Sequence, residues 1–193
     1  MPGSLQAEMW GKYLMKPIRE KVTMPHDPQC QYRTNLLHQL MLDDSFADCK
    51  IVCGSATMKC HRSILAAASP VWRAAFSGNF REAHEATISI QDAELDTVEA
   101  LVRYAYTGEV DANCVASLLP LAHRYELSKL VGLCAQVMYE EMTPGNGVSY
   151  VSLLNTFIQH EEVAAIWPRV VDKVRSNREF NDVLLRSVRH RGV

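Results

Sequence analysis

The sequence predicts a mixed α/β (α+β) fold, in which a few short strands precede a mainly helical remainder. Two runs rich in β-forming residues, 46–53 and 57–60, flank Gly54-Ser55-Ala56, a pattern typical of a tight hairpin. A third short run follows at 86–90, and beyond it apolar residues recur at helical spacing. The 193 residues, 48% of them hydrophobic, suffice for one globular domain with a sizeable core and an appendage.

The appendage is expected at the N-terminus. Residues 1–34 hold four of the eight prolines and show no sustained apolar period, so they are interpreted as a poorly ordered leader or linker. From residue 35 the apolar spacing predicts a short helix that stops at Asp43-Asp44. We therefore expect the main domain at 35–140 and a helical extension with a basic tail at 141–193.

A helical hairpin is predicted directly after the second strand. The alanine-rich segment 63–68 favours a helix that stops at Ser69-Pro70, where Ser69 can cap and Pro70 can open a second helix through Phe76. Gly78 and Asn79 break this second helix, which leaves Phe80-Arg81-Glu82 in a loop.

The rest of the chain is predicted to be helical. Apolar stripes place helices at 98–105, 113–125, 127–140, 150–158 and 163–174. The first of them terminates at Gly108, a residue type common just after a helix. Pro168 interrupts the last stripe and is expected to kink that helix or restart it.

Composition argues against nucleic-acid and membrane partners. Twenty basic and 22 acidic side chains give a net charge of −2, whereas nucleic-acid-binding domains concentrate Lys and Arg. No run approaches the roughly 18 uninterrupted apolar residues that a membrane span needs, and the N-terminus lacks a signal-peptide pattern. The six cysteines lie mostly in apolar segments and are interpreted as reduced core residues. We therefore expect an intracellular protein of the cytoplasm, the nucleus or both.

No local catalytic signature is present. The sequence lacks a Gly-x-Ser-x-Gly elbow, a His-Glu-x-x-His motif and a phosphate-binding glycine loop, so no catalytic residue and no cofactor are expected. Cys49, Cys53, Cys60 and His61 have the composition of a zinc site. Residues four apart in an extended strand lie about 13 Å from each other, however, too far to share one ion. No metal site is expected.

Two features leave alternatives open. Asp48 opens an apolar strand and Arg62 opens an apolar helix, so the two form a buried charged pocket, a structural ion pair, or simply two solvated ends of elements. Phe80 is a large apolar residue between polar neighbours. It either tucks back into the core or is offered to a partner as an anchor beside a carboxylate.

An ordered series of motifs resembles the BTB/POZ domain. The series comprises Phe46-x-Asp48, Cys60-His61-Arg62-Ser63-Ile64-Leu65-Ala66-Ala67-Ala68-Ser69-Pro70-Val71, Phe76, Ile90-x-Asp92 and Tyr104-x-Tyr106-Thr107-Gly108. Within that superfamily the sequence is most similar to the speckle-type POZ proteins over 35–140. Residues 147–190 resemble, more weakly, the start of the BACK region that follows BTB domains. The resemblance implies a small sheet flanked by helical hairpins, followed by a short all-helical BACK-like extension.

The resemblance also implies dimerisation through the first helix, either as a homodimer or with other BTB proteins. Leu37, Leu40 and Ile64 fall where the speckle-type proteins place apolar dimer contacts. A helix this short cannot bury its apolar stripe without a partner surface. Arg33 stands where those proteins tend to have another apolar residue, a departure that could weaken the dimer or shift its register.

A further implication of the resemblance is a cullin partner. BTB proteins that recruit a cullin scaffold carry a hydrophobic-x-Glu motif, which Phe80-Arg81-Glu82 matches. The aromatic ring would fill an apolar pocket on the cullin, while Glu82 would accept a charge-assisted hydrogen bond. Tyr125 and the helices around it would add contact area. The resemblance thus implies a non-enzymatic adaptor of a cullin-RING ubiquitin ligase, acting in ubiquitin-dependent degradation.

Two other functions are consistent with the same resemblance. The speckle-type proteins recognise substrates through a MATH domain before the BTB domain, and residues 1–34 are too short to fold one. The chain could instead be a transcriptional-repressor module whose dimer groove, near Asp48 and Arg62, docks corepressor peptides. It could also be a dominant-negative or purely structural dimerisation module without a ligase link.

Overall fold

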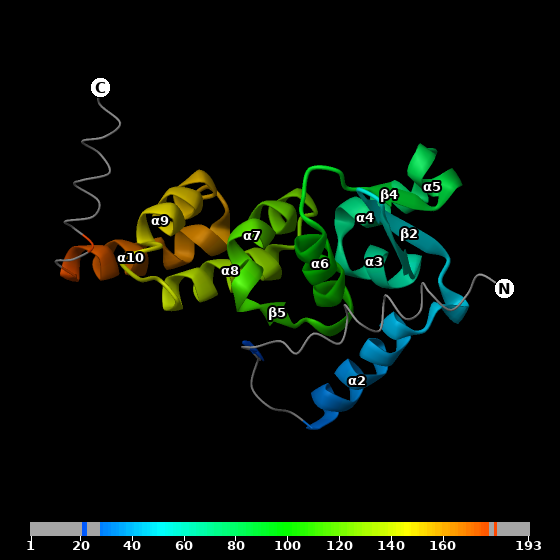
Figure 1. Ribbon diagram of the computed structural model, residues 1–193, viewed down its shortest axis with the longest axis horizontal. Helices are drawn as coiled ribbons and strands as arrows, with labels where there is room; N and C mark the ends of the chain where they lie inside the picture. The colour runs from blue at the N-terminus through cyan, green and yellow to red at the C-terminus, as the bar shows by residue number, and fades with distance from the viewer. Residues whose placement is uncertain (1–20, 23–27, 178–179, 181–193) are drawn as a thin grey trace.

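A small three-stranded sheet lies toward one end of the molecule (Figure 1). In the computed structural model, which describes residues 21–22, 28–177 and 180, the strands lie in the order β3 (Ala56–Cys60), β2 (Cys49–Cys53), β4 (Thr87–Ser89). β2 pairs antiparallel with β3 and parallel with β4. Gly54 adopts a φ of +57° in the turn between β2 and β3, a conformation that glycine reaches without strain. The predicted hairpin is confirmed.

Apolar side chains from all three strands meet in register. Ile51 pairs with Met58 on one side and with Ile88 on the other, and all three are buried. The helical hairpin after β3 adds Trp72, which is fully buried. Burying one aliphatic side chain contributes roughly 1.5–3 kcal/mol, so this cluster stabilises the sheet against the helices.

Helices pack around the sheet and continue beyond it. In chain order they are α2 (Pro28–Leu42), α3 (Arg62–Ala68), α4 (Pro70–Ser77), α5 (Arg81–Glu85), α6 (Leu95–Thr107), α7 (Val115–Arg124), α8 (Ser128–Glu140), α9 (Gly147–Thr156) and α10 (Glu161–Ser176). The short elements are η1 (Asp44–Phe46), η2 (Ala112–Cys114) and an antiparallel pair of β1 (Lys21–Val22) with β5 (Val110–Asp111). Figure 1 shows α9 and α10 at the end opposite to the sheet. The predicted fold class is confirmed.

The junction between α3 and α4 is built on Ser69. Its hydroxyl accepts a hydrogen bond from the Trp72 amide (3.2 Å) and donates one to the Tyr125 carbonyl (2.6 Å). Pro70 follows in the first turn of α4, where its missing N–H costs nothing. The predicted cap is confirmed, and the same hydroxyl also ties α4 to the end of α7.

The helix α10 packs on α8 through buried apolar side chains and through two cationic ones. The Lys173 ammonium donates to the Tyr139 carbonyl (2.6 Å) and to the Glu140 carbonyl (3.1 Å), which satisfies the end of α8. Arg169 and Lys173 also lie 4.5 and 4.8 Å from the centroid of the Tyr139 ring. The assignment of 141–193 as a BACK-like extension stays a prediction.

The first helix begins at Pro28, seven residues earlier than predicted. Proline is well tolerated at the start of a helix, and Tyr32 and Arg33 in its first turns are exposed, which removes the apolar period that the prediction relied on. Residues 28–34 therefore belong to α2 and not to a leader. Residues 1–20 and 23–27 lie outside the described residues.

Two further elements differ from the predictions. Arg81 and Glu82, predicted to lie in a loop, begin the single-turn helix α5, whose first amide hydrogen bonds end on the Phe80 carbonyl. The helix α10 runs through Pro168 as one element, so a restart there is wrong; Pro168 lies on the exposed face of the helix. None of the described helices combines the length and apolar character needed to cross a membrane.

Replacing Ser69 by alanine should destabilise the fold. The Ser69→Ala variant removes the cap of α4 and leaves the buried Tyr125 carbonyl without its donor, so we expect a loss of about 2–3 kcal/mol in the free energy of unfolding. Urea unfolding followed by circular dichroism measures this loss. The exposed Ser63→Ala change in α3 is the control, and equal stability of the two variants would contradict the role given to Ser69.

Candidate protein-interaction site

An apolar hollow of about 500 Å³ lies where α4, α5 and the turn between α7 and α8 meet. We call it the Phe80 hollow, and its lining is mainly apolar with two carboxylates: Pro70, Val71, Ala74, Ala75, Phe80, Glu82 and Glu126. The floor comes from α4, while Phe80 and Glu82 come from the start of α5. The hollow brings together the two ends of the Phe80-Arg81-Glu82 motif.

The Phe80 ring is presented to solvent. Phe80 is the residue just before α5, and 58% of its surface is exposed. The ring lies against Gly78, where a β-carbon would come within 2.6 Å of the Phe80 Cδ2 atom. Of the two alternatives for Phe80, the structure therefore favours the exposed ring over core filler. Glu82, two residues along the chain, is half-buried.

Tyr125 lies behind the hollow and not on its surface. Only 7% of Tyr125 is exposed, and its ring packs on Trp72 with the centroids 5.0 Å apart. Burial raises the pKa of the Tyr125 hydroxyl. The predicted direct contact with a partner is not supported by this placement, because the ring has little surface left to offer. Its ring instead supports α4 by packing on Trp72.

The exposed member of the same turn is Glu126, a residue that the sequence analysis missed. Its φ of +53° is unusual for a residue other than glycine. The available signal was that Glu126 is the single residue between the helices predicted at 113–125 and 127–140. A polar residue at a helix break is commonplace, so this signal alone does not identify a site.

An exposed ion pair braces this turn against the segment that enters α6. The Arg124 guanidinium binds the Asp92 carboxylate through two hydrogen bonds of 2.8 and 2.5 Å. These hydrogen bonds hold the pKa of the Asp92 carboxyl below its usual range. The bidentate geometry orients the end of α7, although solvent screening limits what the pair adds to stability.

The predicted dimer residues lie near several exposed apolar side chains of α2 and η1. Leu37, Leu40 and Ile64 are half-buried, and Leu40 and Ile64 pack against the hydrophobic core. The side chains that α2 and η1 turn outward include Tyr32, Leu36, Leu42 and Phe46, and Leu36 is 52% exposed. We call these four residues the α2 face. The role of Leu37, Leu40 and Ile64 in a dimer stays a prediction.

Asp48 and Arg62 come together, but not as a buried ion pair. The Asp48 carboxylate accepts the backbone amide of Arg62 (2.7 Å), and the Arg62 guanidinium donates to the Asp48 carbonyl (3.2 Å). Asp48 is exposed, and Arg62 also lies over the Phe76 ring, 5.5 Å from its centroid. Of these alternatives, the structure favours solvated ends of elements, with Asp48 capping the first turn of α3.

The cysteines of the sheet are buried thiols. Cys49 and Cys60 lie opposite each other in the pairing of β2 with β3, and burial raises the pKa of Cys49 to about 12. The His61 imidazole is hydrogen-bonded to the Tyr106 hydroxyl (2.8 Å). Among the residues that the structure describes, no group of three or more potential ligands is placed to hold a metal ion.

The comparisons with known proteins identify the fold that carries this site. A sequence profile of the BTB/POZ domain matches residues 37–141. This chain belongs to the BTB/POZ domain family. The matched range includes β2–β4, the Phe80 hollow and both helices beside it.

Relatives of this BTB/POZ chain include two kinds of longer protein. Kelch-like protein 38 of Rattus norvegicus is 31% identical over 128 residues, which cover 63% of this chain and 22% of that protein. BTB and MATH domain-containing protein 42 of Caenorhabditis elegans is 32% identical over 120 residues, 60% of this chain and 29% of that protein. The chain thus spans less than a third of either relative.

A solved BTB domain shares the fold. The BTB domain of zebrafish PATZ1 superposes with a TM-score of 0.50 at 15% sequence identity, over 62% of this chain and 100% of that domain. At this identity the similarity concerns the fold alone. BTB/POZ domains are protein-interaction modules, so the exposed surfaces of this one are its candidate functional sites.

Replacing Gly78 by alanine should displace the Phe80 ring without unfolding this BTB domain. The backbone of Gly78 has φ −92° and ψ −174°, which any residue adopts, whereas a β-carbon there collides with the ring. We expect new NMR shifts for the Phe80 ring and a change in unfolding free energy within about 0.5 kcal/mol. Gly145→Ala is the control, because a β-carbon there meets only Thr143 Oγ1 at 3.8 Å. An unmoved ring in Gly78→Ala would contradict the packing described above.

Proposed function

We propose that this BTB/POZ chain is a non-enzymatic, dimeric adaptor that links target proteins to a cullin-RING ubiquitin ligase. The observation that carries the proposal is the exposed Phe80 ring at the mouth of an apolar hollow, with Glu82 beside it. These are the two residues of the hydrophobic-x-Glu motif of cullin-recruiting BTB proteins. The expected location of such an adaptor is the cytoplasm, the nucleus or both.

The physical basis of the contact is a buried aromatic anchor with a charged neighbour. An apolar side chain of the cullin that covers the Phe80 ring would remove it from water, which contributes roughly 1.5–3 kcal/mol. The Glu82 carboxylate would accept a charge-assisted hydrogen bond at the rim. Contacts of this kind, central and surrounded by apolar residues, typically carry most of the binding energy of an interface.

The adaptor acts by raising effective concentration and not by chemistry. A target held near the ligase meets it in an intramolecular encounter, which increases the rate of transfer without any catalytic group on the adaptor. Targets are expected to come through heterodimers with other BTB proteins or through the helices after residue 147. The α2 face supports the dimeric part of the proposal, since it leaves four large side chains in water in a single chain.

The α2 face also supports a second candidate function. A module that only dimerises, of the transcriptional-repressor or dominant-negative type, needs that face and makes no use of the Phe80 hollow. The two functions therefore separate by experiment, since one requires cullin binding and the other does not.

Truncating Phe80 should strongly weaken cullin binding. We expect Phe80→Ala to weaken the affinity for the purified N-terminal domain of the cullin that BTB proteins recruit about 30-fold or more, because truncating an anchor costs about 2 kcal/mol or more. Glu82→Ala should weaken it by a smaller factor. Surface plasmon resonance measures both affinities.

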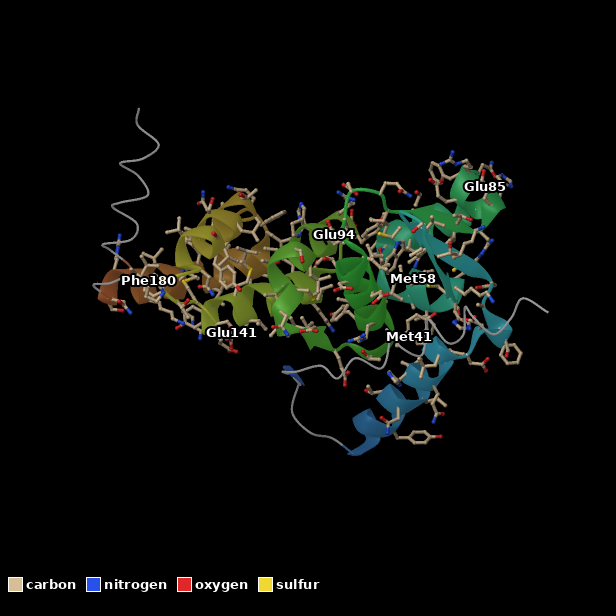
Figure 2. The ribbon with its side chains drawn as sticks, viewed as in Figure 1. Met41, Met58, Glu85, Glu94, Glu141 and Phe180 are labelled. Atoms are coloured by element: carbon tan, nitrogen blue, oxygen red, sulfur yellow. The ribbon has the colours of Figure 1, made fainter. Side chains whose placement is uncertain are left out.

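Glu85→Ala is the matched control for Glu82→Ala. It removes the same charge from the same helix, but Glu85 points outward at the tip of the molecule (Figure 2) and does not line the hollow. Wild-type protein that shows no binding at all would reject the adaptor and leave the dimerisation module.

A charge on the α2 face should separate the dimer. Leu36→Asp places a carboxylate on an exposed position, so the monomer fold is retained while the buried interface acquires an unpaired charge that costs several kcal/mol. Leu37→Asp tests the predicted contact in the same way. Sedimentation velocity should show monomers for both variants and dimers for the wild type and for Ser152→Asp on α9. Wild-type protein that sediments as a monomer would overturn the dimer.

A further inference from the structure

We propose that Glu126 is a specificity-determining residue of the Phe80 hollow, selecting a partner segment that carries a Lys or Arg next to the apolar side chain that covers Phe80. The proposal rests on the proposed function and deepens it. Its occupant is the segment of the cullin that contacts the hollow. Four features of the structure lead to the proposal. They are the position of Glu126, the negative charge of the Phe80 hollow, the absence of a partner for the Glu126 carboxylate among the described residues, and the fixed backbone of Glu126.

Glu126 occupies a central position on this surface. Together with Pro70 and Ala74 it lines both the Phe80 hollow and an adjoining, larger hollow of about 990 Å³. Its chain neighbours Tyr125 and Leu127 are buried, so Glu126 is the exposed residue of this turn. A segment that covers the Phe80 ring and continues into the adjoining hollow therefore passes Glu126.

The charge of the Phe80 hollow is uniformly negative. Its ionisable lining residues are Glu82 and Glu126, and no Lys or Arg lines it. In contrast, the adjoining hollow has Arg73 and Lys129 in its lining. A partner that covered two carboxylates with apolar groups alone would bury both charges unpaired, which opposes binding. A partner that supplies a cation avoids this cost, so the pair discriminates between otherwise similar segments.

The Glu126 carboxylate is free to take such a cation. Within the described part of the chain it makes no hydrogen bond or ion pair, whereas the adjacent Arg124 is already bound to Asp92. The Glu126 carboxylate therefore stabilises no other part of the described structure through a hydrogen bond or ion pair. Its charge is available for a group from outside the chain.

The backbone holds the carboxylate in a fixed place. The left-handed conformation of Glu126 is disfavoured for a residue with a β-carbon, yet buried neighbours hold it on both sides. The Glu126 amide donates to the His123 carbonyl (3.1 Å), and the Leu127 amide donates to the Ala122 carbonyl (2.9 Å). Because the turn is tied to α7 in this way, the side chain starts from a defined point beside α4. A pre-positioned charge loses less entropy on binding than one on a mobile loop.

Charge-neutral and charge-reversed variants test this inference on the whole chain. Affinity and association rate are measured by surface plasmon resonance against the purified cullin N-terminal domain, at about 50 and 300 mM salt. We expect Glu126→Gln to weaken binding about 5- to 10-fold at low salt, mainly through the association rate, and to differ little from wild type at high salt. Glu126→Lys should weaken it about 100-fold or more. Glu85→Gln, equal in charge to Glu126→Gln, should bind as wild type, and circular dichroism checks that all variants are folded.

The outcomes separate this inference from the proposed function. Unchanged binding by Glu126→Gln and Glu126→Lys, with binding lost in Phe80→Ala, would overturn the role of Glu126 and leave the adaptor standing. Tighter binding by either Glu126 variant would indicate that the cullin segment has no Lys or Arg beside Glu126, and would also overturn the role of Glu126. Wild-type protein that does not bind would overturn both. Equal losses in Glu126→Gln and Glu85→Gln would indicate a general charge effect and no selection by Glu126.

Discussion

The hydrogen bond from Ser69 to the Tyr125 carbonyl is the contact on which the interaction surface depends. It joins two segments that are 56 residues apart in sequence, the start of α4 and the end of α7. Trp72 and Tyr125 pack on each other beside it, so the polar contact and the aromatic contact support the same junction. The buried cluster of Ser69, Trp72 and Tyr125 therefore fixes the position of α4 and of the turn after α7, which form the floor and one wall of the Phe80 hollow. The exposed side chains form the rest of its lining.

Rigidity at this junction matters because the exposed part of the site is small. Phe80 and Glu82 come from α5, a helix of five residues with no buried side chain. A helix of this length does not form by itself in water. It is held by its attachment to α4 and β4, and by the packing of the Phe80 ring on Gly78. The surface is thus a short, exposed segment on a stable base, an arrangement typical of binding sites that tolerate sequence change around a fixed scaffold.

The sequence predicts those parts of the fold whose signals are local. The hairpin at Gly54, the Ser69-Pro70 corner and the end of α6 at Gly108 each rest on the conformational preference of one or two residues, and each is found as expected. The start of α2 and the existence of α5 could not be derived in this way. An exposed helical turn has no apolar period, and a five-residue helix is too short to show one.

The same distinction applies to the site. Phe80 and Glu82 follow from a motif that is continuous in sequence. The inward direction of Tyr125 and the exposure of Glu126 follow from tertiary packing, since adjacent residues at a helix end can point to opposite sides. The packing of Trp72 on Tyr125 buries Tyr125 and leaves Glu126 exposed, and this packing is a tertiary contact that the sequence does not reveal.

The attachment of α10 to α8 carries a consequence for chemical modification. A single ammonium, that of Lys173, both satisfies two carbonyls at the end of α8 and lies over the face of the Tyr139 ring. Acylation of that nitrogen would remove its positive charge, and with it the cation–π contact and the strength of both hydrogen bonds. Modification of this one nitrogen atom would therefore weaken the polar contacts between α8 and α10, while the apolar packing between them would remain.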